Sequence, residues 1–110
     1  MEALDRASGS RVWTFELPAE GDAPSVHDKH NLASASPVTD GERVYAIFGT
    51  GQVVAVDARG QRVWVRHVAK DYGPFDIGWG HGSSPLVHGG TLFLVCYHES
   101  AAYLLALDAR

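Results

Sequence analysis

The chain has 110 residues, of which 45% are hydrophobic and 20% charged, and its formal net charge is −4. Its lysines and arginines are scattered singly rather than gathered in the basic stripe of a nucleic-acid-binding protein, and no run reaches the ~18 apolar residues of a membrane span. Residues 1–11 are polar and show no signal-peptide core, and the lone cysteine, Cys96, excludes an internal disulfide and leaves the compartment undecided.

The first segment, residues 1–16, is predicted to contribute one strand, Ser10–Phe15. In this segment Ala3-Leu4-Asp5 leads through Gly9 to Arg11-Val12-Trp13, a pattern that returns later in the chain. Residues 17–32 follow, and their proline, glycine and aspartate residues predict a loop.

Residues 33–67 are predicted to form four short antiparallel strands. Short apolar runs alternate there with turn residues, such as the glycines of Gly49-Thr50-Gly51, which favour a tight hairpin. The expected strands are Ala33–Val38, Arg43–Phe48, Gln52–Asp57 and Arg62–His67.

Residues 68–82 are rich in glycine and predict a second long loop, of a length that is uncommon unless the loop is functional. Residues 83–110 then begin the strand pattern again. The expected strands are Ser83–Val87, Thr91–Tyr97 and Tyr103–Asp108, and a fourth strand is missing.

Two motifs recur at a nearly constant spacing. Ser-Pro pairs begin at Ser36 and Ser84, 48 positions apart, and Trp13 and Trp64 lie 51 positions apart in two Arg-Val-Trp motifs. A period of ~40–50 residues made of short strands is typical of β-propeller blades. We therefore expect an all-β fold, a β-propeller fragment of about two four-stranded antiparallel blades. One blade is complete, one lacks its last strand, and the last strand of a preceding blade stands in front.

The order of these motifs resembles the bacterial PQQ-like (quinoprotein-like) repeat family. The matching residues are Ser36-Pro37-Val38, Asp40-Gly41, Val44-Tyr45, Gly51, Val53, Ala55, Asp57, Gly60 and Trp64. The resemblance implies a parent ring of seven or eight blades and, usually, a periplasmic or exported protein. The dehydrogenases of the family carry an adjacent-cysteine disulfide that this chain lacks, so the resemblance implies the fold rather than quinone chemistry.

The residues that recur once per blade are interpreted as structural. We expect Trp13 and Trp64 to dock one blade on the next. We expect Asp5, Asp57 and Asp108 to cap the turn after each third strand by accepting backbone N–H groups.

A ligand site is expected, if anywhere, at the channel-facing rim where the innermost strands begin. The candidate residues are Asn31, Ser34, Lys70, Asp71, Tyr72, Trp79, His81 and Ser83. The competing interpretation is that small polar residues simply fit a narrow hydrated centre. The chain has six histidines, but their spacing matches no recognised metal-ligand pattern. We predict no catalytic residue and no cofactor, neither PQQ nor a divalent metal.

The absence of a catalytic constellation favours a non-catalytic scaffold that binds a protein or a ligand. Two alternatives stay open: a fragment of a quinoprotein-type oxidoreductase or other channel-mouth enzyme, and a truncated product without autonomous function. The expected partners are other propeller blades, from the parent chain or from further copies. Strand Ser10–Phe15 could then complete the blade that ends at Asp108, and four copies would make an eight-bladed ring.

Overall fold

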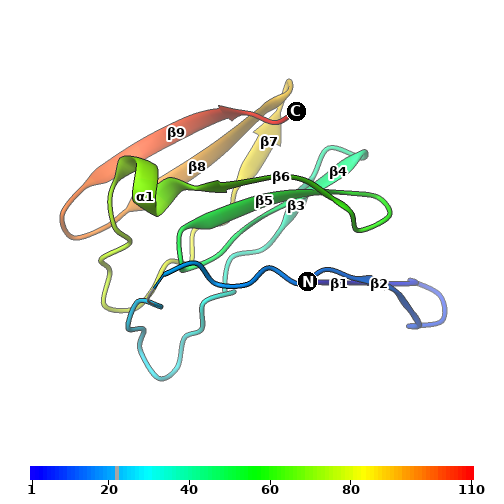
Figure 1. The fold of residues 1–110 in the computed structure, drawn as a ribbon, viewed down its shortest axis with the longest axis horizontal. Helices are drawn as coiled ribbons and strands as arrows, with labels where there is room; N and C mark the ends of the chain where they lie inside the picture. Colours follow the sequence, from blue (N-terminus) through cyan, green and yellow to red (C-terminus); the bar gives the residue numbers. More distant parts are fainter. Residues whose placement is uncertain (22) are drawn as a thin grey trace.

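A computed structural model describes residues 1–21 and 23–110, and it consists of three antiparallel sheets. The N-terminal hairpin contains β1 (Glu2–Leu4) and β2 (Arg11–Thr14). The full sheet contains β3 (Val38–Thr39), β4 (Arg43–Ile47), β5 (Gln52–Asp57) and β6 (Arg62–His67). The open sheet contains β7 (Leu86–His88), β8 (Thr91–Tyr97) and β9 (Ala102–Asp108). Figure 1 shows the three sheets one above another, with the hairpin below and the open sheet above, so the predicted all-β class is confirmed.

The N-terminal segment differs from its prediction. Residues 1–16 hold two paired strands rather than one, with Ala3 opposite Trp13. The turn is closed by hydrogen bonds from the Asp5 amide to the Ser10 carbonyl and from the Gly9 amide to the Asp5 carbonyl. A three-residue strand carries too little alternation to be recognised in sequence, so β1 was not predicted.

Two further differences concern the strand starts and the second loop. The innermost strands, expected at Ala33–Val38 and Ser83–Val87, begin only after Pro37 and Pro85. Proline has no N–H to give to a ladder, and this accounts for the late starts. The predicted loop 68–82 begins with a helical turn, α1 (Val68–Tyr72), whose five residues are too few to show a helical period.

Two apolar layers hold the sheets together. Between the full sheet and the open sheet lie Tyr45, Ile47, Val53 and Ala55 on one side and Leu92, Leu94, Cys96 and Leu107 on the other. Between the full sheet and the N-terminal hairpin lie Ala46, Val54 and Val56, covered by Met1, Trp13, Phe15 and Leu17. Strand β5 is therefore buried on both faces, which explains its unbroken apolar run Val53–Val56.

The open sheet is covered on one face only. Along β8 the burial alternates with period two, so that Leu92, Leu94 and Cys96 are buried while Val95 and Tyr97 are exposed. The outer edge of β9 pairs with no strand among the residues that the structure describes. In the same described part of the chain, no helix has the length and apolar character needed to cross a membrane.

Candidate functional site

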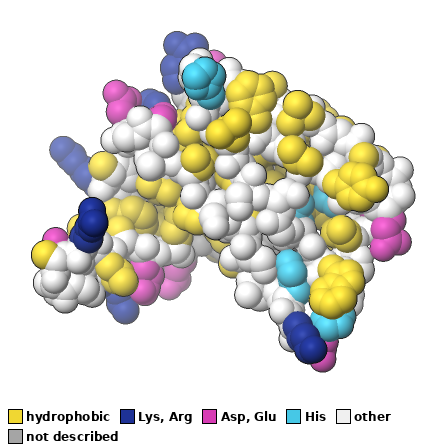
Figure 2. All heavy atoms as spheres, turned by 180° about the vertical axis from the view of Figure 1, so that it is seen from behind, with side chains coloured by type: hydrophobic (Ala, Val, Ile, Leu, Met, Phe, Trp, Pro, Cys, Tyr) yellow, Lys and Arg dark blue, Asp and Glu magenta, His cyan; other side chains and the backbone are white. Residues whose placement is uncertain are grey.

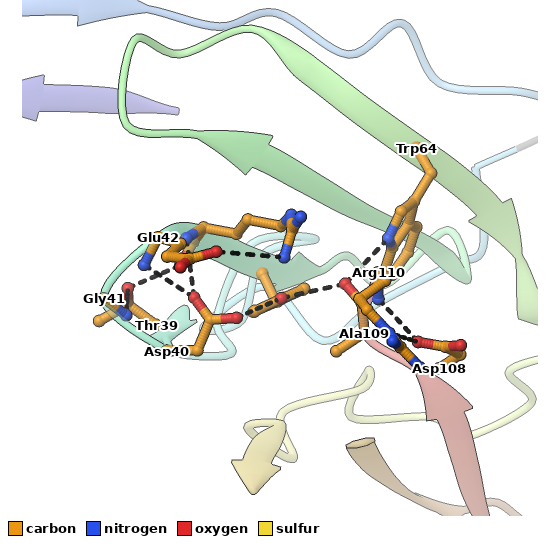
Figure 3. A network of polar contacts seen from close by, with 10 residues as sticks. Thr39, Asp40, Gly41, Glu42, Trp64, Asp108, Ala109 and Arg110 are labelled. Atoms are coloured by element: carbon orange, nitrogen blue, oxygen red, sulfur yellow. Dashed lines mark hydrogen bonds and ion pairs between the residues drawn. The ribbon is translucent and has the colours of Figure 1, made fainter. Parts of the chain in front are cut away.

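The junction between the full and open sheets is held by a polar clamp around Ala109 (Figure 3). The Trp64 indole donates its Nε1–H to the Ala109 carbonyl at 3.2 Å. The Tyr45 hydroxyl lies 3.0 Å from the same carbonyl and 2.7 Å from Asp40 Oδ2, so its single proton is shared between two acceptors. The Tyr45 hydrogen bond lowers the pKa of Asp40 to about 2. Burial of the phenol, together with the adjacent carboxylate, raises the pKa of Tyr45.

The preceding junction repeats this contact. Trp13 donates its Nε1–H to the Ala58 carbonyl at 3.1 Å. Its ring lies directly over Gly60, where a Cβ would approach Trp13 Cδ2 to 2.5 Å. Both tryptophans therefore lie between sheets. Each donates to a carbonyl that directly follows the third strand of the next sheet, Ala58 after β5 and Ala109 after β9.

The three recurring aspartates lie at those turns. Asp57 Oδ1 accepts the Gln61 amide at 2.8 Å, and Asp108 Oδ1 accepts the Arg110 amide at 2.9 Å. Asp5 Oδ1 accepts the Ser8 amide at 2.7 Å, and its hydrogen bonds with Ser8 lower the pKa of its carboxyl. Asp5 and Asp57 satisfy backbone donors where the chain reverses, and Asp108 accepts the equivalent amide directly after β9.

The long loops and the β4–β5 and β8–β9 turns meet at one end of the molecule, here called the loop end. The Gly49 amide donates to the Leu32 carbonyl, the Val68 amide to the Gly51 carbonyl and the Glu99 amide to the Asp76 carbonyl. Five of the eight rim candidates lie on these long loops and three lie on α1; seven of the eight are exposed and His81 is buried.

One group of candidates surrounds His30. Trp79 is 61% exposed and stacks on His27 with ring centroids 3.9 Å apart. Ser34 Oγ donates to the Asn31 carbonyl at 3.1 Å and lies 3.5 Å from His30 Nδ1. The Asn31 side chain accepts the Ala33 amide, so these polar groups mainly stabilise their own loop.

The buried imidazoles of His81 and His98 form a pair against Phe75, whose ring centroid lies 4.7 and 4.3 Å from theirs. His81 Nε2 lies 3.1 Å from the Ser83 carbonyl, which can only accept, so His81 Nε2 carries the proton. His81 Nδ1 is then the acceptor for His98 Nε2 at 3.4 Å. His98 Nδ1 is left as a buried nitrogen without a partner. Burial lowers the pKa of both imidazoles and keeps them neutral.

The remaining candidates lie on or beside α1. Lys70 forms a 2.9 Å ion pair with Glu20 at the mouth of a hollow of about 430 Å³. Its wall is mainly apolar and includes Pro24, Ala69, Pro74 and Phe75. Asp71 lies in a different groove, between β6 and β9, and Tyr72 lies near Tyr103. The eight candidates are thus divided among separate surroundings.

The lining of the hollow does not suit PQQ. That quinone carries three carboxylates, and a site for it needs several cationic or N–H donors. Among the described lining residues Lys70 is the cation, and it already pairs with Glu20, while Asp76 adds a further negative charge. Over residues 1–21 and 23–110, no three His, Cys, Asp or Glu side chains are grouped closely enough to hold a metal ion.

His98 is one of the six histidines considered in the sequence, but neither it nor Phe75 was among the rim candidates. His98 follows β8 directly and resembles an ordinary turn residue. The sequence around it does not predict its contact with His81, which is 17 positions away. The pair exists because the β8–β9 turn folds back on loop 73–82, through Glu99 and Asp76.

Similarity to known proteins agrees with this architecture. Quinohemoprotein alcohol dehydrogenase from Comamonas testosteroni resembles the chain with a TM-score of 0.66 and 19% sequence identity. The match covers 98% of this chain and 16% of the enzyme, and it shows the propeller fold alone. No curated protein matches the chain. A family model described as outer membrane protein assembly factor BamB matches residues 1–110. Because that model spans every residue, the chain belongs to this family of PQQ-like-repeat propeller proteins.

Proposed function

We propose that this chain is a non-catalytic scaffold that binds protein through the uncovered side of the open sheet. The binding surface, here called the open face, consists of Leu86, Phe93, Val95, Leu104 and Ala106. Leu104 is 63% and Leu86 is 60% exposed, although both are large apolar residues of strands, and together with their neighbours they form an exposed apolar patch. Figure 2 shows hydrophobic side chains gathered at its upper right, the side on which the open sheet lies in that view.

The main observation behind the proposal is that the open face corresponds, by the repeat spacing, to the face of the full sheet that is buried against the open sheet. The spacing of 48 places Tyr45 and Ile47 at the positions of Phe93 and Val95, and the spacing of 51 places Val53 at the position of Leu104. Tyr45, Ile47 and Val53 are 0–2% exposed because the open sheet covers them. Within the described part of the chain, the equivalent residues of the open sheet are exposed at Val95 and Leu104 and half-buried at Phe93, although they have the composition of a buried interface.

The free edge of β9 supports the same proposal. In the full sheet the equivalent strand, β5, pairs with β6 over five positions. β9 has seven residues, and the only charged residue among these seven is Asp108, at the end of the strand. An unprotected apolar edge strand is a template for strand addition. The rim candidates, by contrast, occupy separate surroundings, and the exposed Ser34 hydroxyl near His30 donates its proton to the Asn31 carbonyl instead.

The test uses a fluorescent synthetic peptide with the sequence of residues 60–67, which contains the fourth strand of the full sheet, β6. We expect a saturable rise in fluorescence anisotropy when the chain is added. Leu104→Asp should abolish the rise because it places a charge on the open face, whereas Trp79→Asp, at an equally exposed residue of the loop end, should not. A scrambled peptide controls for non-specific binding. Absence of binding at millimolar peptide, or equal binding by Leu104→Asp, would contradict the proposal.

A further inference from the structure

We infer that the hollow beside α1 is a binding site for a small organic cation, an alkyl or arylalkyl amine whose apolar body lies in the hollow. The inference goes beyond the proposed function, because it concerns the loop end and does not depend on the open face. Four segments line the hollow: loop 17–32, the β4–β5 turn, the end of β6 together with α1, and loop 73–82.

The first support is that hydrogen bonds fix the walls of the hollow. The buried Gln52 side chain donates to the Pro18 carbonyl at 2.9 Å, and its Oε1 accepts the Glu20 amide at 3.3 Å. The Val68 amide donates to the Gly51 carbonyl at 2.8 Å, which joins α1 to the β4–β5 turn. A hollow of about 430 Å³ with such walls lies within the size range of small-molecule sites.

The second support is the apolar wall, which suits the body of such a ligand. Phe75 is 6% exposed and packs against the buried imidazole pair, whose ring centroids lie 4.7 and 4.3 Å from its own. Pro24, Ala69 and Pro74 complete this wall. Proline and alanine side chains have no rotamer freedom to lose when a ligand contacts them, so little entropy opposes binding there.

The third support is charge, which favours a cation. Among the described lining residues Glu20 and Asp76 are carboxylates and Lys70 is the cation. Hydrogen bonding with Lys70 lowers the pKa of Glu20, and hydrogen bonding with Ser100 lowers the pKa of Asp76, so both carboxyls are ionised at neutral pH. Lys70 already pairs with Glu20 at 2.9 Å. Asp76 accepts the Ser100 amide at 3.3 Å, and a carboxylate has room for several further donors, so Asp76 is the partner for an ammonium group.

The fourth support is an excess of acceptors around the hollow. His67 also lines it, and His67 Nε2 lies 3.3 Å from the Glu20 carbonyl, which can only accept. In the neutral imidazole Nδ1 is then an acceptor, and it is buried without a partner in the described part of the chain. A neighbouring hollow of about 330 Å³ shares Asp76 with the first and adds the carboxylate of Glu99. An ammonium group, with three donors, supplies what this part of the loop end lacks.

The first experiment titrates the full-length chain with 2-phenylethylamine at pH 8 and follows the backbone amide signals by nuclear magnetic resonance. We expect saturable shifts at Lys70 and Asp76 and none at Gly41, which lies in a turn outside the hollow. Two probes with a similar body are the controls, neutral 2-phenylethanol and anionic 3-phenylpropionate. Both should bind at least fivefold more weakly than the amine. Equal affinity of the three probes, or no saturable shift at the hollow, would overturn the inference.

The second experiment repeats the titration with three variants. Asp76→Asn should weaken amine binding at least fivefold and leave binding of the alcohol unchanged, because it keeps an oxygen for the Ser100 amide but removes the charge. Asp71→Asn, at an exposed carboxylate of α1 in a different groove, should change neither.

Lys70→Met should tighten amine binding, because it removes the competing cation and leaves Glu20 free to pair with the ligand. A variant that merely disturbed the fold would weaken binding of the amine and of the alcohol together. Unchanged amine binding by Asp76→Asn, or weaker amine binding by Lys70→Met, would overturn the inference.

Discussion

The indole nitrogen of Trp64 donates a hydrogen bond to the carbonyl of Ala109 at 3.2 Å, across the junction of two sheets. Trp13 makes the same contact with Ala58, and each donor and acceptor are 45 positions apart. The repeated arginine–valine–tryptophan motif is thus a docking device whose partner is a backbone carbonyl. Every residue has a backbone carbonyl, so the acceptor cannot be recognised in the sequence, whereas the repeated tryptophan can.

Trp64→Phe is expected to lower the free energy of unfolding by about 1–2 kcal/mol. Phenylalanine keeps most of the buried ring but removes the donor to Ala109, and a lost hydrogen bond costs about that amount. The measurement is urea unfolding followed by circular dichroism. Trp79→Phe is the matched control, because Trp79 is 61% exposed. A Trp64→Phe variant as stable as this control would show that the indole hydrogen bond adds nothing.

The Asp40–Tyr45 contact is expected to make stability depend on pH in the acid range. The pKa of Asp40 is about 2 in the folded chain, against 3.8 for the unperturbed group, chiefly because Tyr45 donates to it. A carboxyl with a depressed pKa stabilises the fold above pH ~4, and this contribution is lost as pH falls through 2. Tyr45→Phe should therefore raise the pKa of Asp40 and flatten the fall of unfolding free energy between pH 5 and 2.

Nuclear magnetic resonance titration of the Asp40 carboxyl checks this directly. Asp40→Asn serves as the control, since it keeps an oxygen acceptor for the backbone amides of Glu42 and Arg43 but cannot ionise. Its stability should show the same flattened acid profile. An unchanged Asp40 titration in Tyr45→Phe would contradict the assignment of the pKa shift to the phenol.

The sequence predicted the strands best where apolar runs end at turn residues. β5 and β6 lie at the expected Gln52–Asp57 and Arg62–His67, and β8 at the expected Thr91–Tyr97. β1 and α1 were missed because three and five residues show no periodicity. The candidate rim was harder to predict, because local sequence does not say which loops meet. Lys70 pairs with Glu20 and His81 with His98 only through the packing of loops at one end.

The His81–His98 pair is expected to weaken the fold below pH 6.5. Burial lowers the pKa of both imidazoles below the ordinary 6.5, so the unfolded chain takes up protons first as pH falls. Stability is therefore greatest above pH 6.5 and declines towards the lower folded pKa. His98→Phe should reduce this decline between pH 6.5 and 5, measured by urea unfolding at each pH. His88→Phe, at an exposed histidine, should leave the decline as in the parent chain.

Imidazole nitrogen spectra at pH 7.5 provide an independent check of the same pair. Both rings should carry their proton on Nε2, as the chain from His98 through His81 to the Ser83 carbonyl requires. A protonated imidazolium on either residue at this pH would contradict the neutral assignment.

Gly60→Ala is expected to loosen the N-terminal hairpin, whereas Gly41→Ala should only strain its own turn. Both glycines have positive φ, +77° and +95°, which costs an alanine about 1–2 kcal/mol. At Gly41 a Cβ meets nothing within 4 Å, but at Gly60 it would approach the Trp13 ring to 2.5 Å. The Gly60 variant should therefore lose more stability than the Gly41 variant. It should also exchange the amide hydrogens of Arg11–Thr14 at least tenfold faster, as measured by hydrogen–deuterium exchange. Equal losses and unchanged exchange would mean that the hairpin does not depend on the contact between Trp13 and Gly60.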